Sequence, residues 1–216
     1  MRETLQRLGA LFRATPKVSD AAGFAFLMGA ESARIANKAT IEYCRARTGV
    51  FFYALSEEKL FKDALEVSRW EAFAAVLQDV FILGEGVLRD HAVGRRDALA
   101  DGLEFAFRRE IERWPIPAHR TDWEDVLEAF PRRLRQSQLA EPKAPDVIAK
   151  MGGAVVWSVL PLHERYKNLD RDVVIGNLGF QLLALAEQIH REVELAPVAR
   201  DITTWAGTRS DSQPAD

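Results

Sequence analysis

The chain has 216 residues, of which 48% are hydrophobic, so it can bury a substantial core and wholesale disorder is excluded. Its formal net charge of −3 does not favour nucleic acid as a partner. Three arginine clusters lie near acidic residues, which is typical of solvated helix faces. They are Arg95-Arg96, Arg108-Arg109 and Arg132-Arg133-Arg135. We therefore expect no nucleic-acid partner.

The only cysteine, Cys44, excludes a disulfide framework within the chain and is typical of a reducing compartment. Charged residues interrupt residues 1–14, so they lack the continuous apolar run of a signal peptide. No stretch reaches the ~20 uncharged apolar residues of a membrane span. We therefore expect a cytoplasmic protein without a transmembrane segment.

Residues 1–14 predict a short amphipathic helix with arginines beside its apolar face. The apolar residues on that face are Leu5, Leu8, Leu11 and Phe12. The simpler interpretation is a helix that docks on the body of the protein. The alternative is a peripheral membrane contact, which basic residues beside leucine and phenylalanine favour. A helix this short buries little apolar area, so such a contact would be weak.

A long helix is predicted to begin at Ser19 or Asp20, to run to about Arg47 and to end at Gly49. Its first half is rich in alanine, glycine and serine, which allow another helix to approach closely. The run Val50–Leu55 has strand-like composition, but the chain contains no second run with which it would pair. We therefore expect it to be an apolar connector folded onto the core.

The longest predicted helix covers Ser56–His91, which contains no proline and repeats apolar residues with the helical period. Ser56 is the expected N-cap, and Glu57 and Glu58 in the first turn suit the positive end of the helix dipole. The apolar surface is wide enough for several helices to pack around it. This helix should therefore lie at the centre of the fold.

Proline-containing linkers separate the helices that follow. A helix is predicted over Asp97–Trp114. Its apolar face consists of Leu99, Leu103, Phe107 and Ile111. Residues 115–121 form a linker and the most plausible internal seam. Thr121 and Glu124 predict a capping box for a short helix that Pro131 ends.

Two more helices are predicted, one over Asp146–Leu160 and a long one that begins at Asn168 or Asp170. The stripe of the long helix consists of Val174, Leu178, Leu182, Leu185 and Ile189. Residues 197–216 become polar and are expected to form a partly disordered tail. The sequence thus predicts an all-α fold, an irregular helical bundle of six to eight helices with little or no β-structure, in a single domain over residues 1–196.

The strongest metal-binding signal is the pair Glu187 and His190, which are three residues apart and therefore share a helix face. Ferritin-like dimetal sites use this unit twice, with one more glutamate from each of two other helices. Here the unit occurs once, and Glu31 and Glu85 are the candidates for the further carboxylates. The alternative is that His190 only interacts with the C-terminal end of its helix.

Two other patterns have simple structural interpretations. Asp97 and Asp101 have a spacing that suits magnesium and a diphosphate, but no convincing second acidic cluster accompanies them. We therefore interpret them as the acidic first turn of a helix. Arg45 could lower the pKa of Cys44, but no base is placed beside this thiol by the sequence. A half-buried thiol on a helix is the preferred interpretation.

Two segments, Ser32–Gly49 and Arg69–Val80, resemble a group of uncharacterised helical proteins of alphaproteobacteria. The resemblance covers about a seventh of the chain. It implies a bacterial cytoplasmic protein, and it transfers no activity, cofactor or site residue.

Three functional hypotheses follow from these patterns. The preferred one is a non-enzymatic interaction or adaptor protein that acts through apolar helix surfaces, with a protein partner or as a homodimer, and that needs no cofactor. The second is a helical metal-binding protein or dimetal-carboxylate enzyme that uses Glu187 and His190. The third is a protein that binds an apolar small molecule in a cavity between helices.

Overall fold

The structure, a computed structural model, describes residues 17–205, and for residues 164–169 it describes the backbone alone. This part of the chain is an all-α bundle with seven helices of eleven residues or more, as the sequence predicts. Within it the one pairing of extended backbone is an isolated bridge between Val18 and Val193. The helix predicted over residues 1–14 lies outside the described residues.

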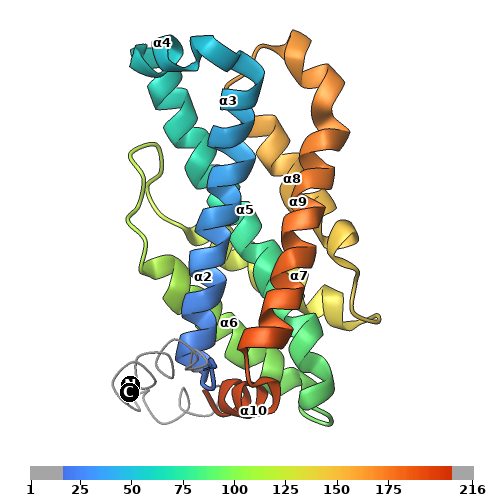
Figure 1. The fold of residues 1–216 in the computed structure, drawn as a ribbon. Helices are drawn as coiled ribbons and strands as arrows, with labels where there is room; N and C mark the ends of the chain where they lie inside the picture. Colours follow the sequence, from blue (N-terminus) through green and yellow to red (C-terminus); the bar gives the residue numbers. More distant parts are fainter. Residues whose placement is uncertain (1–16, 206–216) are drawn as a thin grey trace, which may run out of the picture.

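The elements follow one another along the chain with short connections (Figure 1). In order they are α2 (Ala21–Asn37), the π-helical η1 (Lys38–Glu42), α3 (Tyr43–Thr48), the 3₁₀ turn η2 (Gly49–Phe51), α4 (Phe52–Glu57), α5 (Lys59–Leu88), the 3₁₀ turn η3 (Arg89–His91), α6 (Arg96–Glu112), α7 (Glu124–Gln138), α8 (Pro145–Val159), α9 (Glu164–Glu192) and α10 (Leu195–Trp205). Figure 1 shows α5 in the middle of the bundle, α10 across one end, and α3 and α4 at the other.

The central position predicted for the longest helix is confirmed. α5 packs against α2, α8, α6, α7 and α9, and most of its side chains from Ala72 onward are buried. A helix that is apolar on all sides needs neighbours all round, which the sequence pattern indicated. The predicted start of this helix at Ser56 was wrong, because α5 begins at Lys59. Ser56 is not its N-cap but lies in α4, where its hydroxyl donates to the carbonyl oxygen of Tyr53 (2.7 Å).

The run Val50–Leu55, predicted to be a connector folded onto the core, is helical, and of its large side chains Phe52 is buried whereas Val50, Phe51 and Tyr53 are exposed. Its first residues lie in η2 and the rest in α4. β-Branched and aromatic residues favour strands only where another strand completes their backbone hydrogen bonds. Among the described residues no such strand adjoins this run, and helical turns complete those bonds instead.

α7 differs from the sequence-based prediction at two points. Pro131 lies inside the helix and does not end it. The missing hydrogen bond is offset by the buried residues Phe130 and Leu134, and the Phe130 ring stacks on Phe107 of α6 with 3.9 Å between centroids. The capping box is not formed, because the amide N–H of Glu124 donates to the carboxylate of the residue two positions earlier (3.0 Å).

The packed body extends past the boundary predicted at residue 196. Val198, Ala199 and Ile202 of α10 are buried, and this helix packs on α6. Pro197 is tolerated because it falls in the first turn, where backbone N–H groups have no partner within the helix. At this end the two helices touch closely, since a Cβ atom on Gly102 would lie 2.0 Å from the carbonyl oxygen of Ile202.

Candidate functional site

The four residues predicted to bind a metal do not come together. Glu187 and His190 are exposed on α9, whereas Glu85 is fully buried in α5. Glu31 pairs with Arg34 of its own helix (2.6 Å). Over residues 17–205 no three His, Cys, Asp or Glu side chains form a group that would hold a metal ion.

Glu85 has a different role, as half of a buried ion pair. Arg89 donates from Nε and Nη2 to the two oxygens of Glu85 (2.9 and 2.7 Å), and both side chains are at most 3% exposed. Gln138 adds a third donor at 3.1 Å. Arg89 also donates to the carbonyl oxygens of Ser137 and Ala140. Protein groups therefore supply the hydrogen bonds of this ion pair in place of water, and the pair joins the end of α5 to the end of α7.

A second buried carboxylate, Asp79 of α5, pairs with Arg133 from one of the arginine clusters. Its burial raises the pKa of the Asp79 carboxyl to about 6, against the opposing effect of the arginine. The other carboxylate oxygen lies against the backbone of Gly152 in α8, where a Cβ atom would be 2.1 Å away. This cluster therefore fixes the spacing between α5 and α8.

The remaining sequence candidates also have structural roles. Cys44 is fully buried, and burial raises the pKa of its thiol to about 12. Arg45 does not activate it, because the Arg45 guanidinium lies over the ring of Phe52, 5.3 Å from the centroid. Asp101 pairs with Arg135 of α7 (2.7 Å).

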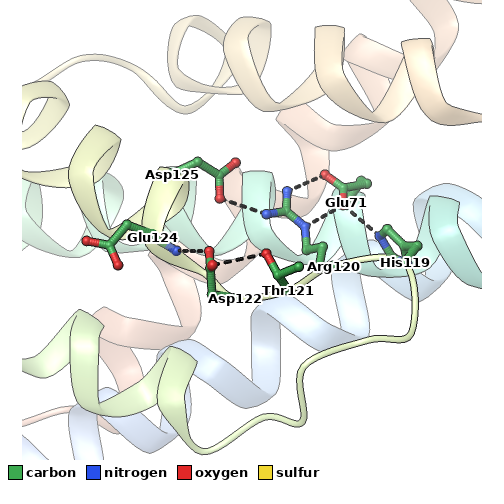
Figure 2. A network of polar contacts seen from close by, with 7 residues as sticks. All are labelled: Glu71, His119, Arg120, Thr121, Asp122, Glu124 and Asp125. Carbon is green, nitrogen blue, oxygen red and sulfur yellow. Dashed lines mark hydrogen bonds and ion pairs between the residues drawn. The ribbon is translucent and has the colours of Figure 1, made fainter.

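The predicted seam at residues 115–121 is tied to α5 by a polar network (Figure 2). Arg120 donates from Nε and Nη2 to the two oxygens of Glu71 (2.6 Å each), and Nε2 of His119 lies 2.8 Å from the same carboxylate. Arg120 also reaches Asp125 (2.7 Å). The Arg120 guanidinium holds the pKa of the Glu71 carboxyl below its usual range. Because Arg120 engages both Glu71 oxygens, the network anchors the loop.

A cleft of about 740 Å³ opens between α9 and the segment η1–α3, where the helix widens into a π-turn. Residues four apart on an α-helix drift by about 40° around the axis. Nevertheless Ser32, Ala36, Thr40 and Cys44 all stay buried, because the wide turn takes up the drift. The same adjustment turns Tyr43 and Arg47 toward α9.

A polar cluster forms one wall of this cleft. The hydroxyl of Tyr43 donates to Oδ2 of Asp170 (2.7 Å), and Nε and Nη2 of Arg47 contact the same oxygen. The Arg47 guanidinium lowers the pKa of the Asp170 carboxyl, and burial raises the pKa of the Tyr43 phenol. Lys38 and Glu42 also line the cleft, and neither forms an ion pair with any residue that the structure describes.

Sequence reasoning missed this cluster. Asp170 is 123 positions from Arg47, and periodicity says nothing about which residues of two distant helices meet. The only local signal was the four-residue spacing of small buried residues from Ser32 to Cys44, which an undistorted α-helix would not keep on one face.

An apolar cavity of about 730 Å³ adjoins the cleft and shares Arg47 with it. Its apolar lining consists of Phe51, Ala54, Leu55, Phe61, Pro161 and Leu162. Beside it the α3–α4 end of the bundle exposes large apolar side chains. These are Val50, Phe51, Tyr53 and Leu60, all at least 69% exposed.

A second exposed apolar surface lies on α8 and α9. On α8 it consists of Val147, Met151 and Val155, and on α9 of Val173, Phe180 and Leu183. We call these six residues the α8–α9 face. None of the described helices has both the length and the hydropathy that crossing a bilayer requires.

Comparison with family models, with curated proteins and with solved structures found no match to this chain. The resemblance of Ser32–Gly49 and Arg69–Val80 to a bacterial family therefore stays a prediction.

Proposed function

We propose that this chain is a non-enzymatic helical interaction protein, that its α8–α9 face binds protein, and that a second copy of the chain occupies that face. The observation that carries the proposal is the apolar stripe on each of two adjacent helices. The buried carboxylates support a non-enzymatic role, because Glu85 and Asp79 are each engaged by an arginine. A cytoplasmic location is part of the proposal, supported by the single buried Cys44.

The stripe on α8 has helical spacing. Val147, Met151 and Val155 follow one another at intervals of four residues, and Met151 is 58% exposed. Gly152 packs against Asp79 of α5, and Gly153 packs against Ile175 of α9. Since each residue turns the helix by about 100°, Met151 and Val155 each lie about 160° from Gly153 and face away from α9. They border a groove that α8 forms with α5 and α7.

α9 carries a second exposed apolar stripe. Phe180 is 74% exposed, and Val173 and Leu183 lie within two turns of it. Val174 and Leu178, on the opposite side, are buried in the core. α8 and α9 pack on each other and both contact α5, so each presents its exposed stripe on the outer surface of the bundle.

The size of the face indicates how strong the association would be. α8 has 15 residues and is therefore ~22 Å long, and two helices side by side are ~20 Å wide. That footprint is below the ~800 Å² per partner of a standard interface. A twofold dimer in which each copy covers the other's stripes is the simplest closed arrangement. We therefore expect a weak dimer whose population depends on concentration.

Sedimentation equilibrium from low to several hundred micromolar protein tests this proposal. We expect the average mass of the wild type to rise toward that of a dimer. Phe180→Asp should stay monomeric, because it places a charge in the centre of the apolar face. The matched control is Leu60→Asp, which alters an 86% exposed leucine at the other end of the molecule and should associate like the wild type.

Two outcomes would contradict the proposal. One is a wild-type chain that remains monomeric over the whole concentration range. The other is a dimer that Leu60→Asp dissociates and Phe180→Asp leaves intact, which would move the interface to the α3–α4 end.

A further inference from the structure

The cleft and the apolar cavity form one groove along α3, α4 and the start of α9. The cavity contributes about 730 Å³ of mostly apolar space, and the cleft contributes about 740 Å³ with charged side chains in its lining. Each lies within the range of cavities that hold small organic ligands. Arg47 lines both, so a ligand whose apolar part fills the cavity would place its polar end beside Arg47.

The Arg47 guanidinium is bound on one side by Asp170. Nε and Nη2 contact Oδ2 of Asp170, and Tyr43 donates to the same oxygen. The hydrogen bonds from Tyr43 and Arg47 all go to Oδ2 of Asp170, and the Arg47 side chain is 37% exposed. The wall of the cleft therefore presents the second oxygen of Asp170 beside an accessible guanidinium.

The charges of the described residues that line the cleft balance. Lys38 and Arg47 are cationic, and Glu42 and Asp170 are anionic. Lys38 and Glu42 are the two that form no ion pair within the described part of the chain. A head group with a single charge would find as much repulsion as attraction here, whereas a head group with both signs would meet an opposite charge on each side.

The geometry points to a binding site for a single-chain amphiphile with a zwitterionic head group. The alkyl chain lies in the cavity formed by Phe51, Leu55, Phe61 and Leu162. The anionic part of the head group lies toward Arg47 and Lys38, and its cationic part toward Glu42 and Asp170. The cleft shares Val173 with the α8–α9 face, but the inference does not rest on the proposed function.

Calorimetry with dodecylphosphocholine below its micelle concentration tests the site, with dodecanoate and dodecyltrimethylammonium as singly charged probes of equal chain length. We expect one molecule bound per chain, with the zwitterion binding most tightly. Each methylene removed from the alkyl chain should weaken binding by up to about fourfold, as expected for a chain that is buried.

Blocking the cavity should abolish binding. Ala54→Trp fills the cavity from an exposed position on α4, so it removes no buried contact. We expect at least a tenfold loss of affinity for dodecylphosphocholine. The matched control is Ala30→Trp, an exposed alanine of α2 outside the groove, which should bind like the wild type.

Two charge substitutions test the head-group assignment. If Glu42 and Lys38 had only a structural role, these substitutions would not change which probe binds most tightly. Glu42→Lys gives the cleft an excess of positive charge and should switch the preference to dodecanoate. Lys38→Glu should switch it to dodecyltrimethylammonium. Both residues lie at the rim of the cleft and have no ion-pair partner to lose among the described residues.

Several results would overturn the inference. They are no binding of any probe, binding that Ala54→Trp and Ala30→Trp affect equally, tighter binding of a singly charged probe to the wild type, or charge variants that leave the order of the three probes unchanged.

Discussion

Both ends of the bundle contain large apolar residues, but these residues are buried at one end and exposed at the other. At one end α10 covers the bundle, and Val198 and Ile202 are completely buried. At the other, no helix formed by residues 17–205 covers α3 and α4, and Val50 and Leu60 are almost completely exposed. Figure 1 shows α10 and α4 at opposite ends of the long axis. Apolar composition thus does not distinguish core from surface here. The presence of a covering element does.

The comparison also separates two kinds of arginine–carboxylate pair. Arg89 and Glu85 are enclosed by protein, whereas the Arg47 side chain at the open end is 37% exposed beside Asp170. Removing one partner of an enclosed pair leaves an unpaired buried charge and therefore destabilises the fold. A half-exposed pair leaves polar atoms accessible to a ligand. The following expectations test this contrast, from the largest effect to the smallest.

Arg89→Ala should have the largest effect on stability. It leaves the buried Glu85 carboxylate without its partner, which costs about 3–5 kcal/mol of unfolding free energy. Urea titration followed by circular dichroism measures the change. Arg47→Ala is the comparison variant at the open end, and its loss should be much smaller. Equal losses would show that the two pairs do not differ as described.

Gly102→Ala should strain the closed end. The new Cβ would lie 2.0 Å from the backbone carbonyl oxygen of Ile202, so α10 must move away from α6. We expect a loss of about 1–3 kcal/mol in the same titration. Gly176→Ala on α9 is the control, since a Cβ there meets nothing within 4 Å. It should stabilise by about 0.5–1 kcal/mol, because alanine is the better helix former. A neutral Gly102→Ala would mean that α10 is not closely packed.

The buried Asp79 should make stability depend on pH. Burial raises the pKa of this carboxyl to about 6, above its usual value of 3.8, so the folded chain holds a proton that the unfolded chain has lost. The stabilisation that the raised pKa of Asp79 provides is fully present below pH 3.8 and is lost as the pH rises through about 6. Asp79→Asn removes this titration. Between pH 4.5 and 7.5 the wild type should lose about 1–3 kcal/mol relative to the variant.

Unfolding free energies of wild type and Asp79→Asn at several pH values check this expectation. Glu110, whose pKa is also raised by burial, contributes with the same sign to both proteins and cancels in the difference. Parallel curves for the two proteins would show that Asp79 titrates as an ordinary carboxyl.

The smallest effect is expected at the open end. Leu60→Ser alters a side chain that makes little contact with the protein, so unfolding free energy should change by less than about 0.5 kcal/mol. The same urea titration measures it. A loss similar to that of Gly102→Ala would show that the α3–α4 end is covered in solution.

Helical periodicity predicted the fold well where one helix face determines the outcome. The residues assigned to the inner faces of α6 and α9, such as Leu103, Phe107 and Leu182, are buried. Local rules failed where tertiary packing outweighed them. Pro131 lies within α7 because burial of its neighbours outweighs one lost hydrogen bond. The run Val50–Leu55 became helical because the described part of the chain offers no strand beside it.

The groove was less accessible to sequence reasoning than the fold. Tyr43, Arg47 and Asp170 meet only because α9 returns alongside α3. The predicted metal residues illustrate the opposite error. Glu187 and His190 have suitable spacing, but both are exposed on α9, and no other side chain of the described residues completes a metal-binding group with them.

Cross-linking is the most direct test of the α8–α9 face. Cys44 is buried and its pKa is raised to about 12, so the wild-type chain provides an unreactive background for an introduced cysteine. Leu183→Cys treated with a short bifunctional maleimide should give a covalent dimer in high yield, whereas Leu60→Cys should give almost none. Comparable low yields from both variants, at a protein concentration of several hundred micromolar, would contradict the assignment of α8 and α9 as the interaction surface.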